Sequence, residues 1–452
     1  MTNKIIFKIA LTLLISSISF TVSYANSRLN VETHTKEEIR TYLIDNIDEN
    51  QPITYLENPS LIPPYSTGKL SEQTQVSALK SLNAMRYIAG LNYDIKLKEE
   101  YIDYAQTASL VNSINDIMTH TPMKPKGMNN ELYMKGLRGA GESNISTNYN
   151  TINQSIVSGY MEDDERDNLE NVGHRRWCLD PQMEYTGFGS VQGHSTMYAV
   201  DSVNSNKNKH DKSILEKISS HLSKEEYTVV WPAQLMPTDF FDVNDPWSIS
   251  MDQYIDKEKV EVELINKNTN QVWHFNSDKS DGYFEVNNES YGQKGCIIFR
   301  PDEIVDEYGT TPTFKDGDKF SIYIKGNFKS ILYDVEFFDI VPIKDVSIKE
   351  DKVNIDISQN TYVNSIVYPQ NATNNEAIKW TSSNEDVATV DEYGNIYTIS
   401  EGATTITIQT PNGKSDSCKI NVLNEDDDCK VSHNHKECDK ETDNIHSKDC
   451  KY

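Results

Sequence analysis

The spacing of the apolar residues changes along the chain from helical to strand-like, and this change limits the folds open to it. Between residues 72 and 117 apolar side chains recur every three or four positions, which predicts two helices, the first ending at Gly90. From residue 227 to 342, short runs of β-branched and aromatic residues alternate with turn residues, which is typical of a β-sandwich. The sequence therefore predicts an α+β multidomain protein.

The length of 452 residues exceeds what one hydrophobic core usually serves, so we expect several domains. The expected segments are a signal peptide at 1–25, an N-terminal extended arm at 26–71, a helix-and-strand domain at 72–231, a β-rich domain at 232–342, a second β-sandwich at 343–424, and an acidic tail with Cys and His at 425–452. Within the arm, one short helix is expected near residues 35–46.

The first 25 residues have the pattern of an export signal. Lys4 and Lys8 precede an apolar run at 9–20, which is too short to span a bilayer comfortably. Residues 23–25, Ser-Tyr-Ala, fit the small-x-small cleavage rule, so the mature chain is expected to start near Asn26. An uncleaved anchor is the alternative. We expect a secreted or cell-surface protein with no membrane span after signal removal.

The composition narrows the choice of partners. A formal charge of −26 argues against a nucleic-acid partner, because a polyanion would be repelled. For an exported chain, an extracellular ligand or surface component is the expected partner. Six cysteines are too few for a disulfide scaffold at this length, and their pairing cannot be deduced from spacing.

The candidate functional residues lie in three fragments. The most unusual is 173–181, Gly-His-Arg-Arg-Trp-Cys-Leu-Asp-Pro, which contains His174. His120 precedes a Thr-Pro stop, and Glu142 follows a glycine-rich stretch that suggests tight backbone around a fixed carboxylate. Glu162 lies in an acidic run, 162–167. Structural roles are the alternative: a capping or core histidine at 120, and salt bridges from the two arginines to the acidic run.

The segment from about 72 to 231 resembles the CAP superfamily, the cysteine-rich secretory, antigen 5 and pathogenesis-related proteins, in its bacterial form. The matching residues are Leu82-Asn83-x-x-Arg86, Tyr104-Ala105-Gln106, His120, Gly141-Glu142 and Gly173-His174. The resemblance implies an α-β-α sandwich with a cleft holding His120, Glu142, Glu162 and His174. The chain departs from the family pattern after Glu142, after His174 and at Gly159, which leaves Asp163, Asp164 or Glu165 as alternatives to Glu162.

The segment from 346 to 422 resembles a bacterial group 2 immunoglobulin-like domain. The matching residues are Tyr368-Pro369-x-x-Ala372-Thr373, Trp380-Thr381-Ser382-Ser383-Asn384, Val387-Ala388-Thr389-Val390-Asp391, Gly394 and Gly402-Ala403-Thr404. The resemblance implies an immunoglobulin-like β-sandwich that acts as a spacer or adhesive unit on a bacterial surface protein.

Two neutral imidazoles are good ligands for Zn²⁺ or another divalent metal, so His120 and His174 are the expected metal ligands. We rank first an exported protein whose CAP-type head binds a ligand or metal and is carried by β-sandwich modules. The alternative is a secreted metal-dependent hydrolase of peptide or cell-wall material, with Glu142 and Glu162 as catalytic carboxylates. Binding of an apolar ligand, which the family resemblance also allows, ranks third.

Overall fold

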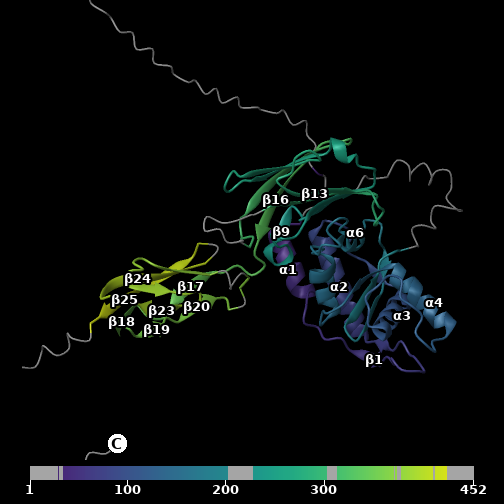
Figure 1. The fold of residues 1–452 in the computed structure, drawn as a ribbon, viewed down its shortest axis with the longest axis horizontal. Helices are drawn as coiled ribbons and strands as arrows, with labels where there is room; N and C mark the ends of the chain where they lie inside the picture. Colours follow the sequence, from purple (N-terminus) through teal and green to yellow (C-terminus); the bar gives the residue numbers. More distant parts are fainter. Residues whose placement is uncertain are drawn as a thin grey trace, which may run out of the picture.

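The computed structural model describes residues 29, 34–201, 228–302, 313–370, 372–373, 378–410 and 413–424. The expected signal peptide at 1–25 and the expected tail at 425–452 lie outside these residues. Figure 1 shows a helical part, a β-sandwich above it and a separate C-terminal β-domain.

The N-terminal arm is not extended throughout, because it contains a packed helix. The helix expected near 35–46 is confirmed by α1 (Lys36–Asn46), which begins with a capping box between Thr35 and Glu38. Its Ile39 and Leu43 are buried in the main core. Lys36 Nζ lies 2.7 Å from Glu336 Oε1, so the arm is held against the sandwich. Two short strands, β1 (Tyr55–Glu57) and β2 (Lys69–Leu70), pair within the rest of the arm.

The helical part is built around a small antiparallel sheet. Its strands, in spatial order, are β4 (Ser143–Ser146), β7 (His194–Tyr198) and β6 (Phe188–Val191). Its three long helices are α2 (Glu72–Ile88), α3 (Glu99–Asn115) and α4 (Asn130–Gly141). The two helices expected between 72 and 117 correspond to α2 and α3.

Helices cover both faces of this sheet. A Cβ at Gly189 would overlap the backbone of Ala105, so α3 lies directly on strand β6. The next side chain along that strand, Phe188, points the other way and joins the core that contains Leu82 of α2. Gln75 of α2 donates to the Phe188 carbonyl oxygen over 2.6 Å, which fixes the helix against the strand.

The glycine-rich stretch before Glu142, where tight backbone is expected, is the end of α4, which packs closely on α3. Farther along the chain, the short helix α5 (Ile152–Gln154) continues as a π-helix, η1 (Ser155–Tyr160). The remaining elements are α6 (Gly173–Cys178) and the pair β3 (Lys96–Leu97) and β5 (Tyr185–Thr186).

The β-rich part is a sandwich of two sheets. One contains β13 (Gly282–Asn287), β14 (Gly295–Pro301), β10 (Trp247–Met251) and β8 (Thr228–Trp231). The other contains β12 (Val272–Phe275), β11 (Glu261–Asn266), β15 (Lys319–Lys325), β16 (Ile331–Phe338) and β9 (Leu235–Pro237). Two short 3₁₀ turns are η2 (Thr238–Phe240) and η3 (Lys257–Lys259). Strand β8 lies within the segment 72–231 expected for the first domain, but it pairs with β10 and so belongs to the sandwich.

One continuous hydrophobic core joins the helical part and the sandwich. It runs from Ile39 of α1 through Leu82 of α2 and Trp247 of β10 to Phe338 of β16. Because the apolar faces of both parts are buried against each other, we expect them to fold as one unit. We call this unit, residues 34–340, the head.

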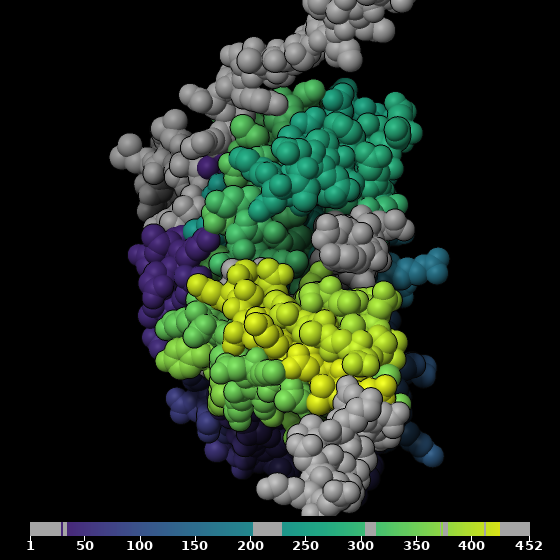
Figure 2. All heavy atoms as spheres, turned by 90° about the vertical axis from the view of Figure 1, so that its left-hand side faces the viewer, coloured from purple at the N-terminus to yellow at the C-terminus, as the bar shows by residue number. Residues whose placement is uncertain are grey.

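The C-terminal domain has its own core. Its strands are β17 (Asp345–Ile348), β18 (Lys352–Asp356), β19 (Asn360–Tyr362), β20 (Ser365–Tyr368), β21 (Lys379–Ser382), β22 (Ala388–Val390), β23 (Asn395–Thr398), β24 (Gly402–Gln409) and β25 (Ser415–Leu423). Buried side chains such as Ile406 and Ile420 form a cluster that shares no residue with the core of the head. Figure 2 shows this domain, in green to yellow, facing the viewer below the teal sandwich.

Candidate functional site

His174 lies in the first turn of α6 and is oriented by a buried carboxylate. Its Nδ1 is 2.8 Å from Asp163 Oδ1, and the second oxygen of Asp163 accepts the Arg175 backbone N–H over 2.9 Å. Burial alone would lower the pKa of His174, but the Asp163 carboxylate outweighs it and the pKa is raised. The side chain of His174 keeps 17 % of its surface exposed, and the described residues give its Nε2 no hydrogen-bond partner.

His120 lies on the exposed connection between α3 and α4 and is oriented by a backbone carbonyl. Its Nδ1 is 2.7 Å from the carbonyl oxygen of Ala140, near the end of α4. A carbonyl can only accept, so Nδ1 carries the proton and Nε2 of the neutral ring keeps its lone pair. The two expected metal ligands therefore have the same arrangement, Nδ1 bonded to oxygen and Nε2 left as the basic nitrogen.

Glu142 caps the C-terminus of α4 and its carboxylate is already engaged. Oε2 accepts a hydrogen bond from Arg138 Nε over 3.0 Å and another from the Tyr198 hydroxyl. The Arg138 guanidinium also stacks over the ring of Tyr104, with 4.5 Å to the ring centroid. Two donors therefore hold this oxygen in place. Tyr198 and Arg138 were not predicted from the sequence, since nothing in its spacing links them to Glu142.

A single stretch of backbone, 140–144, connects three of the four predicted site residues. Ala140 binds the His120 ring, Glu142 follows it, and Asn144 Nδ2 donates to the His174 carbonyl oxygen over 2.9 Å. Four residues of extended chain span at most about 14 Å. The backbone positions of Ala140 and Asn144, which contact the two histidines, are therefore no farther apart than that.

Glu162 lies among other acidic side chains and is partly buried. Burial raises its pKa to about 8, and the neighbouring carboxylates of Asp245 and Asp164 add to the effect. Its backbone carbonyl, not its side chain, accepts a hydrogen bond from Arg175. Of the acidic residues considered for the site, Asp163 is the one bonded to a histidine. The sequence predicts a site residue somewhere in the acidic run 162–167. The structure shows which one: Asp163 has left-handed backbone, with φ of 48°, and its carboxylate faces His174.

The side chains available as metal ligands limit how a metal could be bound here. Within the part of the chain that the structure describes, no three His, Cys, Asp or Glu side chains are grouped as the ligands of one ion. A metal at this site would take Nε2 of His120 and His174, with solvent completing its coordination. In the neutral rings both nitrogens carry lone pairs, which fits that role.

The cysteines of the described domains make no disulfide. Cys178, Cys296 and Cys418 are free and buried. In the same residues, no helix has the length and apolar character needed to cross a bilayer.

Comparison with known proteins identifies one part of the chain. Residues 342–420 match the family model of the bacterial Ig-like domain (group 2). No curated protein matches the chain.

Three solved structures illustrate the structural likenesses. A C-terminal intimin fragment in complex with the translocated intimin receptor is 11 % identical, with 44 % of this chain and 63 % of that chain covered and a TM-score of 0.15. Domains 4 and 5 of the S-layer protein SbsC are 17 % identical, with 36 % and 99 % covered and a TM-score of 0.17. Drosophila N-cadherin EC1-4 is 12 % identical, with 42 % and 47 % covered and a TM-score of 0.16. Likenesses at TM-scores this low say nothing about what this chain binds.

The family match and the separate core coincide with the segment that the sequence assigned to this module. The C-terminal domain, residues 342–420, is a bacterial Ig-like domain of group 2.

Proposed function

We propose that this chain is an exported bacterial surface or secreted protein whose head binds a divalent metal through His120 and His174. The group 2 Ig-like domain then acts as a spacer or adhesive module. The observation that carries the proposal is the shared orientation of the two imidazoles, each with Nδ1 held by an oxygen. Metal-binding histidines are oriented in this way by carbonyl and carboxylate acceptors.

The layers of the helical part support a CAP-type head. The small sheet has α3 on one face and the core of α2 on the other, as the resemblance implies. One of the residues that carry the resemblance, Arg86, makes structural hydrogen bonds there. Arg86 donates to the carbonyl oxygens of Cys178 and Asp180, each over 2.9 Å, and ties α2 to the end of the His174 helix.

The export part of the proposal rests on residues 1–25 and on the type of the C-terminal module. Expression of the full chain in a bacterial host, followed by fractionation, tests it. The expected product lies in the medium or at the cell surface and begins near Asn26. A full-length product retained in the cytoplasm contradicts export but leaves metal binding open.

Metal content tests the binding part. The mature chain shortened at residue 424 removes the three cysteines and three histidines of the tail, which could bind metal themselves. Protein prepared in zinc-containing medium is expected to retain the ion, and a His120→Ala/His174→Ala double variant is expected to lack it. Equal metal content in the two proteins contradicts the proposal.

A metal-dependent hydrolase is the second candidate, and one observation favours it. Glu162, with its pKa raised to about 8, would carry a proton at neutral pH and could act as a general acid. A bound metal would supply a Lewis acid and an activated water. Turnover of a peptide or cell-wall substrate that Glu162→Gln abolishes would support this role. Zinc binding without turnover would support metal binding alone and contradict the hydrolase.

A further inference from the structure

Two consecutive arginines of α6 are buried where this helix meets strands β8 and β10. Arg175 is 1 % exposed and Arg176 is 3 % exposed. The sequence favoured salt bridges from them to the acidic run 162–167, but the structure pairs them differently. Every side-chain hydrogen bond that it gives the two guanidinium groups goes to an uncharged oxygen.

These acceptors are mainly backbone carbonyls. For Arg175 they are Met161 O at 2.5 Å, Pro246 O at 2.5 Å, Ser248 Oγ at 3.3 Å, and Glu162 O. For Arg176 they are Glu289 O at 2.7 Å, Gln293 O at 2.8 Å, Asn287 Oδ1 at 2.9 Å and Asn171 O at 3.3 Å. The carboxylates of Asp163 and Asp245 interact with Arg175 through space, yet burial still lowers the pKa of both guanidinium groups. Part of the cost of burying the two charges is therefore not offset, so an anion beside the pair would be favoured.

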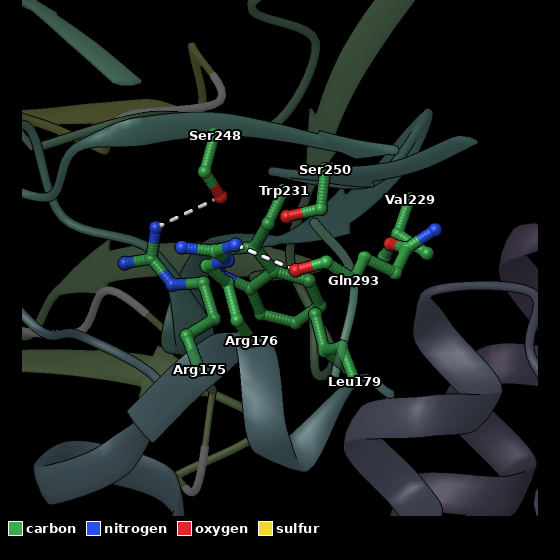
Figure 3. A pocket seen from close by; sticks show the side chains of 8 residues that line it. All are labelled: Arg175, Arg176, Leu179, Val229, Trp231, Ser248, Ser250 and Gln293. Atoms are coloured by element: carbon green, nitrogen blue, oxygen red, sulfur yellow. Dashed lines mark hydrogen bonds between the residues drawn. The ribbon is translucent and has the colours of Figure 1, made fainter. Parts of the chain in front are cut away.

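A small cavity adjoins both arginines. It measures about 10 Å³ and is also lined by Trp231, Ser248 and Ser250, as Figure 3 shows. Arg176 Nε and Trp231 Nε1 are buried and have no hydrogen-bond partner among the described residues. Both side chains line this cavity, so two N–H donors and two positive charges adjoin one small space.

We propose that this cavity binds a single monatomic anion of the chloride class. Its volume corresponds to about one solvent-sized particle, which excludes carboxylates and phosphates. Water could accept the two N–H groups, but it would bring no negative charge to two buried cations whose nearby carboxylates only partly offset their burial. A halide meets both needs, since it only accepts hydrogen bonds and carries a full negative charge.

The position of the cavity gives the anion a structural consequence. Arg176 belongs to α6 of the helical part and Trp231 to β8 of the sandwich. An ion bound to both therefore links the two halves of the head. Stability of the head should then depend on halide concentration, and not only on ionic strength.

The test compares thermal unfolding of the mature chain in sodium chloride and in sodium gluconate at equal ionic strength. Wild-type head is expected to melt at a higher temperature in chloride, with a saturable dependence on its concentration. Trp231→Phe keeps the ring but removes one donor, and loss of a hydrogen bond to a charged group should weaken chloride binding about ten-fold or more. The matched control is Trp177→Phe, an indole of α6, the helix of the two arginines, that does not line the cavity.

The chloride response is expected to survive Trp177→Phe unchanged. A melting temperature that is the same in chloride and gluconate overturns the proposal, as does a response that Trp231→Phe leaves intact. If Trp231→Phe fails to fold, crystals of the wild-type chain grown in bromide decide the question. Anomalous density beside Arg176 Nε and Trp231 Nε1 supports the site, and a water-like peak without anomalous signal overturns it.

Discussion

Asp163 and His174 form a hydrogen-bonded pair, with 2.8 Å between Asp163 Oδ1 and His174 Nδ1, at the point where α6 begins. The carboxylate is completely buried and also binds the backbone N–H of Arg175. This contact fixes the ring orientation and selects the nitrogen that can bind a metal or a proton.

Replacing Asp163 with Asn should lower the pKa of His174. The amide keeps the shape but loses the charge that offsets burial of the ring. Because the folded-state pKa is raised, the pair stabilises the fold at low pH, and this stabilisation is lost as pH rises through that pKa. NMR titration of the His174 ring measures the shift. Asp164→Asn, an exposed neighbour, is the control, and an unchanged His174 titration in Asp163→Asn would rule out the electrostatic account.

Glu162→Gln should remove a loss of stability that the wild-type head shows as the pH rises. Burial raises the folded pKa of Glu162 to about 8 from 4.5, so the wild-type head loses stability as pH rises between these values. Gln cannot ionise, so the variant should gain stability relative to wild type at alkaline pH. Melting temperatures measured from pH 4 to pH 9 test this, with the exposed Glu165→Gln as control. Parallel pH profiles for Glu162→Gln and wild type would contradict it.

Gly139→Ala should destabilise the head by about 1–3 kcal/mol. The added methyl would overlap the carbonyl oxygen of Tyr104, so α4 would have to move away from α3. The matched control is Gly141→Ala, where the new Cβ would be 3.7 Å from the His120 carbonyl oxygen. That variant should be neutral or gain up to about 1 kcal/mol from helix propensity. Urea unfolding measures the free energy of unfolding of both variants. Equal effects would mean that the close contact between α4 and α3 is not the reason why Gly139→Ala is destabilising.

The full chain should unfold in two separate steps. The Ig-like domain has a core of its own, whereas the helical part and the sandwich share one. Deleting residues 342–424 should leave the head transition unchanged, and the helical part and the sandwich should melt together. Calorimetry of the two chains checks this. Separate transitions for the two halves of the head would show that their shared core does not couple them.

Local patterns predicted much of this structure. The helix expected near 35–46, helices α2 and α3, and the strands of the segment 227–342 are present because their apolar spacing matches the faces they bury. The Ig-like domain was predicted from its motifs and is confirmed by the family match.

The rest depended on contacts between distant segments. The glycines of α4 suggest tight backbone, but the close contact with α3 that they allow becomes visible only when both helices are placed. The pairing of β8 with β10 and the buried arginines at the sandwich depend in the same way on the shared core. At the site, sequence named both histidines but not the orientation of Asp163, which follows from its left-handed backbone.

Calorimetric titration with Zn²⁺ is the most direct test of a shared site at His120 and His174. The protein is the mature chain ending at residue 424, and the control variant is His274→Ala, an exposed histidine of the sandwich. We predict one bound ion for wild type and for His274→Ala, weaker binding at low pH because protons compete for Nε2, and loss of binding in both His120→Ala and His174→Ala. Zinc binding that survives removal of either imidazole would contradict the account.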